Sequence, residues 1–266
     1  MARGLDGALA IFAALERHHP DADTELHFRN AFELLVATVL SAQSTDRRVN
    51  EVTPALFARY PTPAALAAAA PADVEVLVHS TGFFRQKARA VTALSRSLVD
   101  EHDGAVPADM AALVQLPGVG RKTANVVLGH ALGVPGFPVD RHVLRVAGRL
   151  GLIHTDDPVK AETALTALLP ETRWTRASDT LILHGRRICT PTPKCDLCHA
   201  RTLCPYAVTS LRAARVKGAA RLSARVAKSA AKSAATAPLA RRSAGAPTGA
   251  KAGKAAPPKA AGRGRR

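Results

Sequence analysis

Two apolar helical patterns are separated by the short stretch Leu116-Pro117-Gly118-Val119-Gly120, which constrains the fold more than any other part of the chain. Proline lacks an amide proton and glycine readily adopts left-handed backbone angles, so a helix arriving from Leu113 ends here. A new helical pattern begins at Arg121. The sequence therefore predicts a helix, a tight hairpin and a second helix, whose unpaired N-terminal amides and positive dipole end suit a phosphate group.

Two other interpretations fit part of this stretch. The spacing alone is equally compatible with an ordinary turn between two packed helices. A nucleotide-binding P-loop requires a lysine directly after its last glycine. Here Arg121 separates Gly120 from Lys122, and no strand pattern precedes the glycines, which excludes the P-loop.

The rest of the body also predicts helices. No alternating pattern of useful length predicts a strand, so we expect an all-α body of roughly ten helices. Asn30 followed by Glu33 is typical of a capping box, and the helix after it is apolar nearly all round, as expected for a central, buried helix. The expected helices cover residues 5–18, 31–40, 46–59, 63–69, 71–79, 84–102, 121–132, 140–150, 158–169 and 174–188, and a further one begins at 107–109 and ends at the hairpin.

The positive charge of the chain is concentrated near its C-terminal end. The formal net charge is +16, but residues 211–266 contain 15 of the 37 Lys and Arg residues and no Asp or Glu. Residues 1–210 therefore hold 22 basic against 21 acidic residues. Because residues 211–266 are rich in Ala, Ser, Gly and Pro and lack aromatic side chains, we expect a disordered basic tail that binds polyanions.

All four cysteines lie within sixteen residues, in the pattern Cys189-x5-Cys195-x2-Cys198-x5-Cys204. The start of the chain shows no secretory signal, so disulfides are not expected and the pattern indicates one metal centre. Four-cysteine zinc sites usually contain two Cys-x2-Cys pairs, and only one such pair is present here. On spacing alone, zinc and an iron–sulfur cluster are comparably compatible with the pattern.

Four features in this order resemble the endonuclease III family of helix-hairpin-helix DNA glycosylases. They are the hairpin at 116–127, the run Leu40-Ser41-Ala42-Gln43-Ser44-Thr45-Asp46, the run Val139-Asp140-Arg141-His142, and the cysteine pattern. Together they are highly specific. The resemblance covers roughly residues 1–208.

The resemblance implies two helical domains that flank a DNA-binding cleft. A six-helix domain containing the hairpin would span residues 24–134, and residues 1–23 and 135–210 would form the second domain. The four cysteines would hold a [4Fe–4S] cluster. The family usually has six residues between the first two cysteines, whereas Cys189 and Cys195 are separated by five.

The resemblance also implies the catalytic residues. Lys122 would attack C1′ of the sugar as a neutral amine, displace the damaged base and form a Schiff base that permits β-elimination 3′ to the lesion. We expect partial burial, Arg121 and the helix dipole to lower the pKa of Lys122. Asp140 would stabilise the developing positive charge. Taken alone, Lys122 would be interpreted as a phosphate contact and Asp140 as a helix N-cap.

Several further residues would contact DNA according to the resemblance. Gln43 would fill the space vacated by a flipped nucleotide. Phe83 stands where the family commonly has a leucine wedge, and the alternative for this side chain is core packing. The remaining predicted DNA contacts are Gly118, Gly120, Arg121 and His142.

We therefore expect a bifunctional DNA glycosylase and apurinic/apyrimidinic (AP) lyase that removes oxidised pyrimidines from duplex DNA containing damaged bases or abasic sites. We expect a bacterial, cytoplasmic, nucleoid-associated monomer that does not bind membranes. An adenine–DNA glycosylase would lack a lysine at the position of Lys122 and carry a folded C-terminal domain. An 8-oxoguanine glycosylase typically lacks the four cysteines. A non-catalytic protein that clamps phosphate with the hairpin is the alternative of another class, and the presence of both Lys122 and Asp140 argues against it.

Overall fold

The computed structural model describes residues 4–210, 220–221, 223–225 and 228. The chain divides into two units, residues 1–215 and 216–266. All regular structure in the described ranges is helical, which confirms the predicted all-α fold. The predicted tail, residues 211–266, lies outside the described residues apart from the six positions from 220 onward. No helix in these described ranges is long and apolar enough to cross a membrane.

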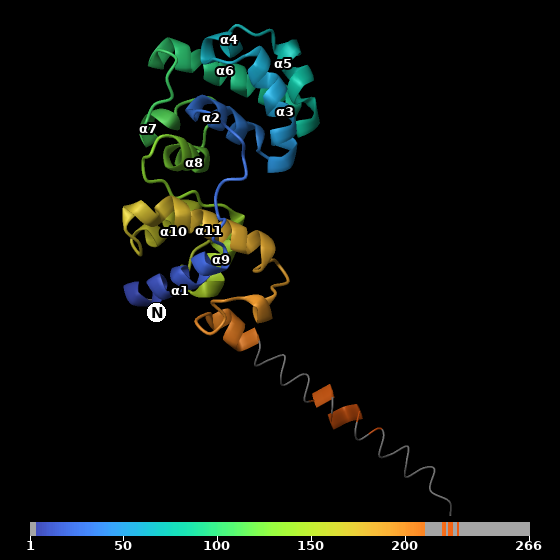
Figure 1. The fold of residues 1–266 in the computed structure, drawn as a ribbon, viewed down its shortest axis with the longest axis vertical. Coiled ribbons are helices and arrows are strands. Elements are labelled where there is room, and N and C mark those ends of the chain that lie inside the picture. Colours follow the sequence, from blue (N-terminus) through green and yellow to red (C-terminus); the bar gives the residue numbers. More distant parts are fainter. Residues whose placement is uncertain (1–3, 211–219, 222, 226–227, 229–266) are drawn as a thin grey trace, which may run out of the picture. The chain divides into compact units, whose positions relative to one another are not determined.

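One apolar core is built by seven consecutive helices, which Figure 1 shows gathered together. It contains buried side chains from Leu26 to Leu128. Its helices are α2 (Ala31–Leu40), α3 (Asp46–Arg59), α4 (Pro63–Ala67), α5 (Pro71–Val78), α6 (Phe84–His102), α7 (Met110–Leu113) and α8 (Arg121–Ala131), with the short 3-10 helix η1 (His79–Thr81).

Helix α2 lies at the centre of this core, as its uniformly apolar sequence predicts. Nearly all of its side chains are buried. The side chain of Asn30 accepts a hydrogen bond from the amide of Glu33 at 3.0 Å, which is half of the expected capping box. The carboxylate of Glu33 reaches one residue further back than expected and accepts from the amide of Arg29 at 2.8 Å. The start of α2 is thus fixed from both sides.

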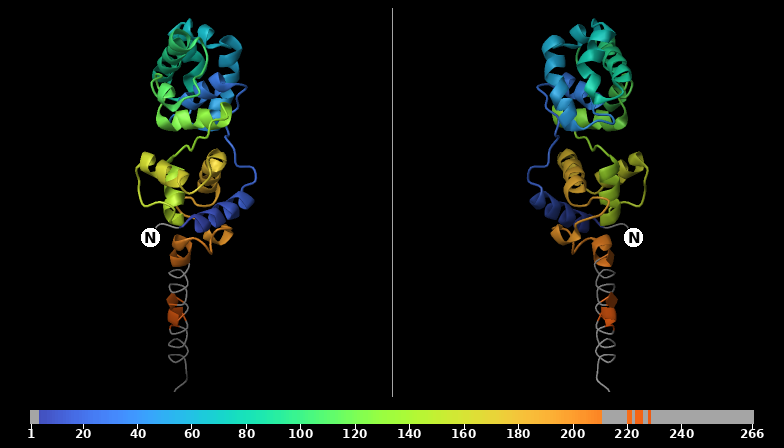
Figure 2. Two further views of the ribbon diagram at one scale, coloured as in Figure 1. Left: turned by 90° about the vertical axis from the view of Figure 1, so that its left-hand side faces the viewer. Right: turned by 90° about the vertical axis from the view of Figure 1, so that its right-hand side faces the viewer.

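A second apolar core is built by helices from both ends of the body. It joins buried side chains of residues 8–15 to those of residues 137–207, and Figure 2 shows the same grouping from two other sides. Its elements are α1 (Leu5–His18), α9 (Arg141–Leu150), α10 (Pro158–Thr166), α11 (Trp174–Arg187) and the 3-10 helices η2 (Glu171–Arg173) and η3 (Cys195–Leu197). The domain boundaries inferred from the resemblance, 24–134 on one side and 1–23 with 135–210 on the other, stay a prediction.

The predicted hairpin is present, although the helix before it is shorter than expected. Helix α7 covers only Met110–Leu113. The carboxylate of Asp109 caps its start by accepting from the amide of Ala112 at 2.8 Å, and Val114 is its C-cap residue. In the turn, the amide of Val119 donates to the carbonyl of Leu116 at 3.1 Å. Gly118 has a φ of +78°, which explains why glycine is needed at this position.

The segment after α8 is clamped against that helix by backbone contacts. The side chain of Asn125 accepts from the amide of Phe137 at 3.1 Å. A Cβ atom on Gly136 would overlap the backbone carbonyl of Asn125. From the other side, the hydroxyl of Thr175 donates to the carbonyl of Gly136 at 3.0 Å. This clamp sets where the chain enters α9 and hence where Asp140 lies.

We predict that Gly136→Ala destabilises the protein by about 1–3 kcal/mol, because the added methyl group must push apart two packed backbone segments. The matched control is Gly148→Ala in α9, where an added Cβ meets nothing within 4 Å. That change should be stabilising by up to about 1 kcal/mol, since alanine is the better helix former. Urea unfolding of the three proteins measures both effects. Equal stability of the wild type and Gly136→Ala would contradict the clamp.

Candidate active site

Asp140 is held by the backbone at the start of α9. Its Oδ1 atom accepts hydrogen bonds from the amides of His142 at 2.7 Å and Val143 at 2.9 Å. Within the described part of the chain, Oδ2 accepts no hydrogen bond. A helix N-terminus favours a negative charge, so the carboxylate is both oriented and stabilised. The N-cap interpretation is thus geometrically correct, and it leaves one oxygen available for chemistry.

Lys122 lies in the first turn of α8, directly after the hairpin. Its side chain is exposed, which differs from the partial burial expected from the sequence. Gly120 is the N-cap residue and supplies no side-chain cap, so the start of α8 remains open to an outside acceptor. An added Cβ at Gly120 would meet nothing within 4 Å, which is consistent with an open surface beside the lysine.

Lys122 and Asp140 line the same cavity. Side chains of α2, α3, α8 and α11 and of the segment 23–26 form its walls. The cavity therefore lies where elements of the two apolar cores meet. Its charged lining residues are Asp23, Glu25, Asp46, Lys122, His130, Asp140, Asp179 and Arg186.

Arg186 of α11 holds one wall of this cavity. Its guanidinium forms ion pairs with Glu25 and with Asp46, the latter at 2.9 Å. Asp46 is the first residue of α3, and Glu25 lies on the segment that joins α1 to α2. Arg186 thereby ties three separate elements together. The neighbouring Arg187 pairs in turn with Asp21 at 2.8 Å.

A second group of charged side chains, Asp23, His130 and Asp179, also lines the cavity. The two ring nitrogens of His130 lie 3.3 Å from carboxylate oxygens of Asp23 and Asp179. Burial favours the neutral ring, but hydrogen bonding and attraction from Asp179, with a further contribution from Asp23, raise the pKa of His130 above its usual 6.5. Burial also raises the pKa of Asp179. The ring of His130 therefore lies between two carboxylates at the junction of α8, α11 and the segment before α2.

Three of the predicted DNA contacts line one separate hollow beside the hairpin, namely Gln43, Phe83 and Gly118. All three have positive φ angles, of 53°, 48° and 78°. Left-handed backbone is rare for residues with side chains and is concentrated at functional sites. Phe83 is also 62% exposed, so core packing does not account for it.

Arg121 and His142 are engaged in contacts within the protein. The guanidinium of Arg121 forms two hydrogen bonds of 2.8 Å with the two carboxylate oxygens of Glu162 in α10. His142 is half-buried, and its Nδ1 atom lies 3.0 Å from the guanidinium of Arg145. Both residues remain beside the hairpin and Asp140, but the charge of Arg121 is compensated and His142 packs against Gly185 of α11.

The four cysteines surround a single cavity and form no disulfide. Its other lining residues include the apolar Leu150, Ile188 and Pro193 and the polar Arg149, His184 and Lys194. Arg149 donates to the sulfur of Cys189 at 3.4 Å and to the carbonyls of Thr190 and Pro191 at 2.6 and 3.0 Å. The five-residue gap after Cys189 therefore closes around an arginine, and all four cysteines still line one cavity.

Comparison with known proteins places these features in a family. Residues 36–171 match the HhH-GPD superfamily of base excision DNA repair proteins. The chain is 47% identical over 212 residues to endonuclease III of Synechocystis sp., covering 79% of this chain and 97% of that protein. With the Escherichia coli K12 enzyme it shares 40% identity over 199 residues, which cover 74% and 94% of the two chains. The chain belongs to the HhH-GPD superfamily. Within it, the protein is a DNA glycosylase and AP lyase of the endonuclease III type.

A solved structure of a trapped endonuclease III–DNA covalent intermediate has the same fold. It superposes with a TM-score of 0.74 at 40% identity, and the match covers 79% of this chain and 99% of that one. The resemblance stated from the hairpin, the Gln43 run, the Asp140 run and the cysteines is therefore confirmed at the level of family. Sequence reasoning missed Glu162, Asp23, His130 and Asp179, because these residues belong to no local motif and meet their partners only in the fold.

Proposed function

We propose that this repair enzyme acts on oxidised pyrimidines and abasic sites in duplex DNA, with Lys122 as nucleophile and Asp140 as charge-stabilising carboxylate. The observation that carries the proposal is that both side chains line one cavity, each at the N-terminal end of a helix. The endonuclease III relative was solved as a covalent intermediate with DNA, which supports chemistry through a protein nucleophile.

In the first step, the neutral amine of Lys122 forms a bond to C1′ of the damaged nucleotide. The glycosidic bond breaks, and the leaving base takes its electron pair and a proton. The sugar ring opens to an iminium ion that links lysine and C1′. Positive charge develops at the sugar, and Oδ2 of Asp140 is the uncapped oxygen that can stabilise it.

In the second step, the iminium acidifies the proton on C2′. A base removes that proton, the C3′–O bond breaks, and the 3′ phosphate leaves with the electron pair. Water then releases Lys122 from the unsaturated sugar. Asp140 is placed to assist the proton transfers. The reaction therefore needs no external oxidant or reductant.

Backbone amides of the protein would contribute to DNA binding as much as its charged side chains. The open amides at the start of α8 would accept a phosphate, and the exposed glycines Gly118 and Gly120 permit its close approach. Gln43 and Phe83, which are both exposed and line the neighbouring hollow, would enter the duplex. The pair of Arg121 with Glu162 would hold the start of α8 against α10, and the backbone amide of His142 would hold the carboxylate of Asp140.

We propose further that the cysteine cavity holds a [4Fe–4S] cluster. The fit rests on four cysteines that line one cavity, with the guanidinium of Arg149 directed at the sulfur of Cys189 and the amide of Ala207 directed at the sulfur of Cys204, each at 3.4 Å. Such donors are suited to thiolates that carry negative charge. The cluster would supply a rigid cross-link and an electron-transfer centre. The expected cytoplasmic, nucleoid-associated location of the protein stays a prediction.

We predict that Lys122→Ala abolishes strand cleavage and the complex trapped by borohydride, while binding of lesion DNA is largely retained. The control is Lys160→Ala, which removes an exposed lysine of the same protein at α10. If Lys122 only contacted a phosphate, its loss would instead weaken DNA binding and lower the slope of log K against log salt concentration by about one unit. A trapped complex formed by Lys122→Ala would exclude this lysine as the nucleophile.

We predict that Asp140→Asn lowers single-turnover cleavage by about 2 to 4 kcal/mol in barrier terms, because the electrostatic stabilisation is lost. Asparagine is as good an N-cap as aspartate, so the protein should still fold. Asp157→Asn is a matched control, since Asp157 caps α10 with the same two-amide geometry at 2.8 and 2.9 Å. If both variants cleave at the wild-type rate, Asp140 is only a helix cap.

We predict that protein purified without air contains about four iron atoms per chain and absorbs light at roughly 400 nm, as expected for a thiolate-bound cluster. Metal analysis and the absorption spectrum measure both. Replacing Cys198 by Ala should remove the absorption and most of the iron. One zinc atom per chain with no iron would overturn the cluster assignment and identify a structural zinc site.

A further inference from the structure

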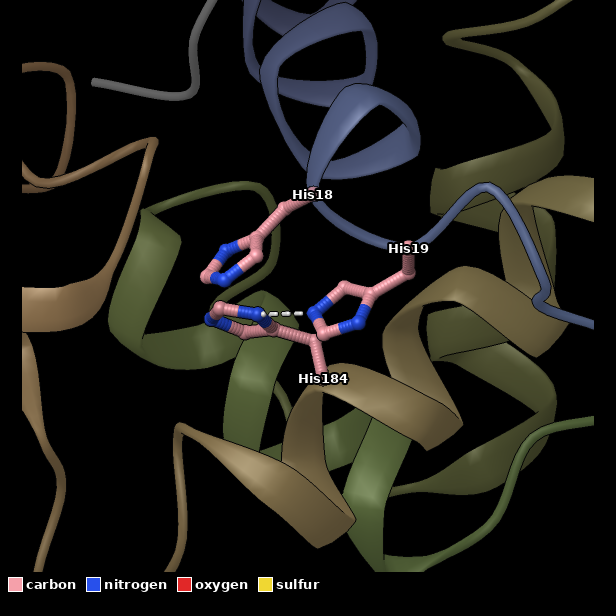
Figure 3. A group of neighbouring side chains, drawn as sticks. All are labelled: His18, His19 and His184. Atoms are coloured by element: carbon pink, nitrogen blue, oxygen red, sulfur yellow. Dashed lines mark hydrogen bonds between the residues drawn. The ribbon is translucent and has the colours of Figure 1, made fainter.

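Three histidines meet beside the cysteine cavity, and neither the repair chemistry nor the cluster requires all of them. His18 ends α1, His19 follows it directly, and His184 lies in the last turn of α11. One ligand nitrogen from each ring lies within 4.8 Å of the other two. Figure 3 shows the three rings turned toward one another, with His19 and His184 joined by a hydrogen bond.

The hydrogen bonds of His184 determine which of its ring nitrogens donates a proton and which carries a lone pair. Its Nε2 atom lies 3.6 Å from the sulfur of Cys198, and its Nδ1 atom lies 2.9 Å from Nε2 of His19. When Cys198 is a thiolate, as in the proposed cluster, a ring that donates Nε2–H to it keeps a lone pair on Nδ1. That lone pair points into the group of histidines. A metal ligand whose second nitrogen donates to an anionic partner is the usual arrangement in protein metal sites.

His18 supplies an independent observation. Its Nδ1 atom is buried and has no hydrogen-bond partner in the described chain. An unpaired buried nitrogen is unfavourable and points to a ligand that would satisfy it. The other two rings are almost completely buried, each 2% exposed. Burial, then the charges of His18 and Arg187, lowers the pKa of His19 to about 4, so its ring is in the neutral form that binds metals.

We propose that His18, His19 and His184 bind one borderline divalent cation such as Zn²⁺, with water as the fourth ligand. Imidazole nitrogens are the donors that zinc, copper and nickel prefer. In a tetrahedral zinc site, two ligand nitrogens lie about 3.3 Å apart. The hydrogen-bonded nitrogens of His19 and His184 therefore need to separate by only about 0.4 Å to bind the ion.

Binding also requires a movement of His18. The ring of His18 lies between those of His19 and His199, at centroid distances of 4.5 and 3.9 Å. The ring has to rotate out of this stack so that a nitrogen lone pair reaches the ion. The bound ion would fasten the end of α1 to α11 next to Cys198.

The test adds ZnCl2 alone to the full-length protein as purified, with its iron in place, in a buffer that does not chelate metals. Calorimetry and metal analysis should find one Zn²⁺ per chain and an unchanged iron content. His18→Asn should bind Zn²⁺ at least tenfold more weakly. His154→Asn removes an exposed histidine elsewhere in the same core region and should bind like the wild type.

A second measurement needs no variant and so does not depend on the folding of one. Cu²⁺ added to the wild-type protein should give an electron paramagnetic resonance spectrum with couplings from three nitrogens. The proposal is overturned if no Zn²⁺ binds beyond the iron, if bound Zn²⁺ displaces iron from the cysteines, or if folded His18→Asn binds Zn²⁺ as tightly as the wild type. Copper coupled to fewer than three nitrogens would also overturn it.

Discussion

The body of this enzyme contains two separate apolar cores, and polar side chains join them. Arg186 pairs with Asp46 across the junction, and Arg121 pairs with Glu162. His130 contacts Asp179 at the same junction. Ion pairs of this kind need good geometry and contribute less net stability than apolar packing. These pairs do orient the two cores relative to each other, because each pair forms in one arrangement of the cores only. The cavity with Lys122 lies at this junction, so its shape depends on these pairs.

Local chemistry explains why most helices could be predicted from the sequence. Asn30, Thr45 and Asp140 each cap the helix that follows them through a side-chain oxygen. Prolines start α4, α5 and α10. Such signals act over three or four residues and are therefore visible in one sequence. Helix α7 is the exception, since it ends at Leu113 and is far shorter than the apolar pattern indicated.

The site could be predicted only as far as it consists of short motifs. Lys122, Asp140, Gln43 and the cysteines stand in runs that resemble a known family, and the structure brings the first two to one cavity. Which charges are already compensated depends on residues far apart in the sequence. Arg121 was expected to contact DNA, yet Glu162, 41 positions away, already binds its guanidinium. No periodicity or spacing relates these two residues before the chain has folded.

Helix α9 connects Asp140 to the cysteine loop. It begins at the Asp140 cap, and its arginines near the other end, Arg145 and Arg149, donate to the carbonyl of Cys189 at 3.0 and 3.5 Å. Ten helical residues form a stiff rod about 15 Å long. The order of the cysteine loop is thus transmitted mechanically along that rod to the carboxylate at its opposite tip. Any shift of the cysteine loop would therefore tilt this rod and displace the carboxylate of Asp140, which lines the cavity together with Lys122.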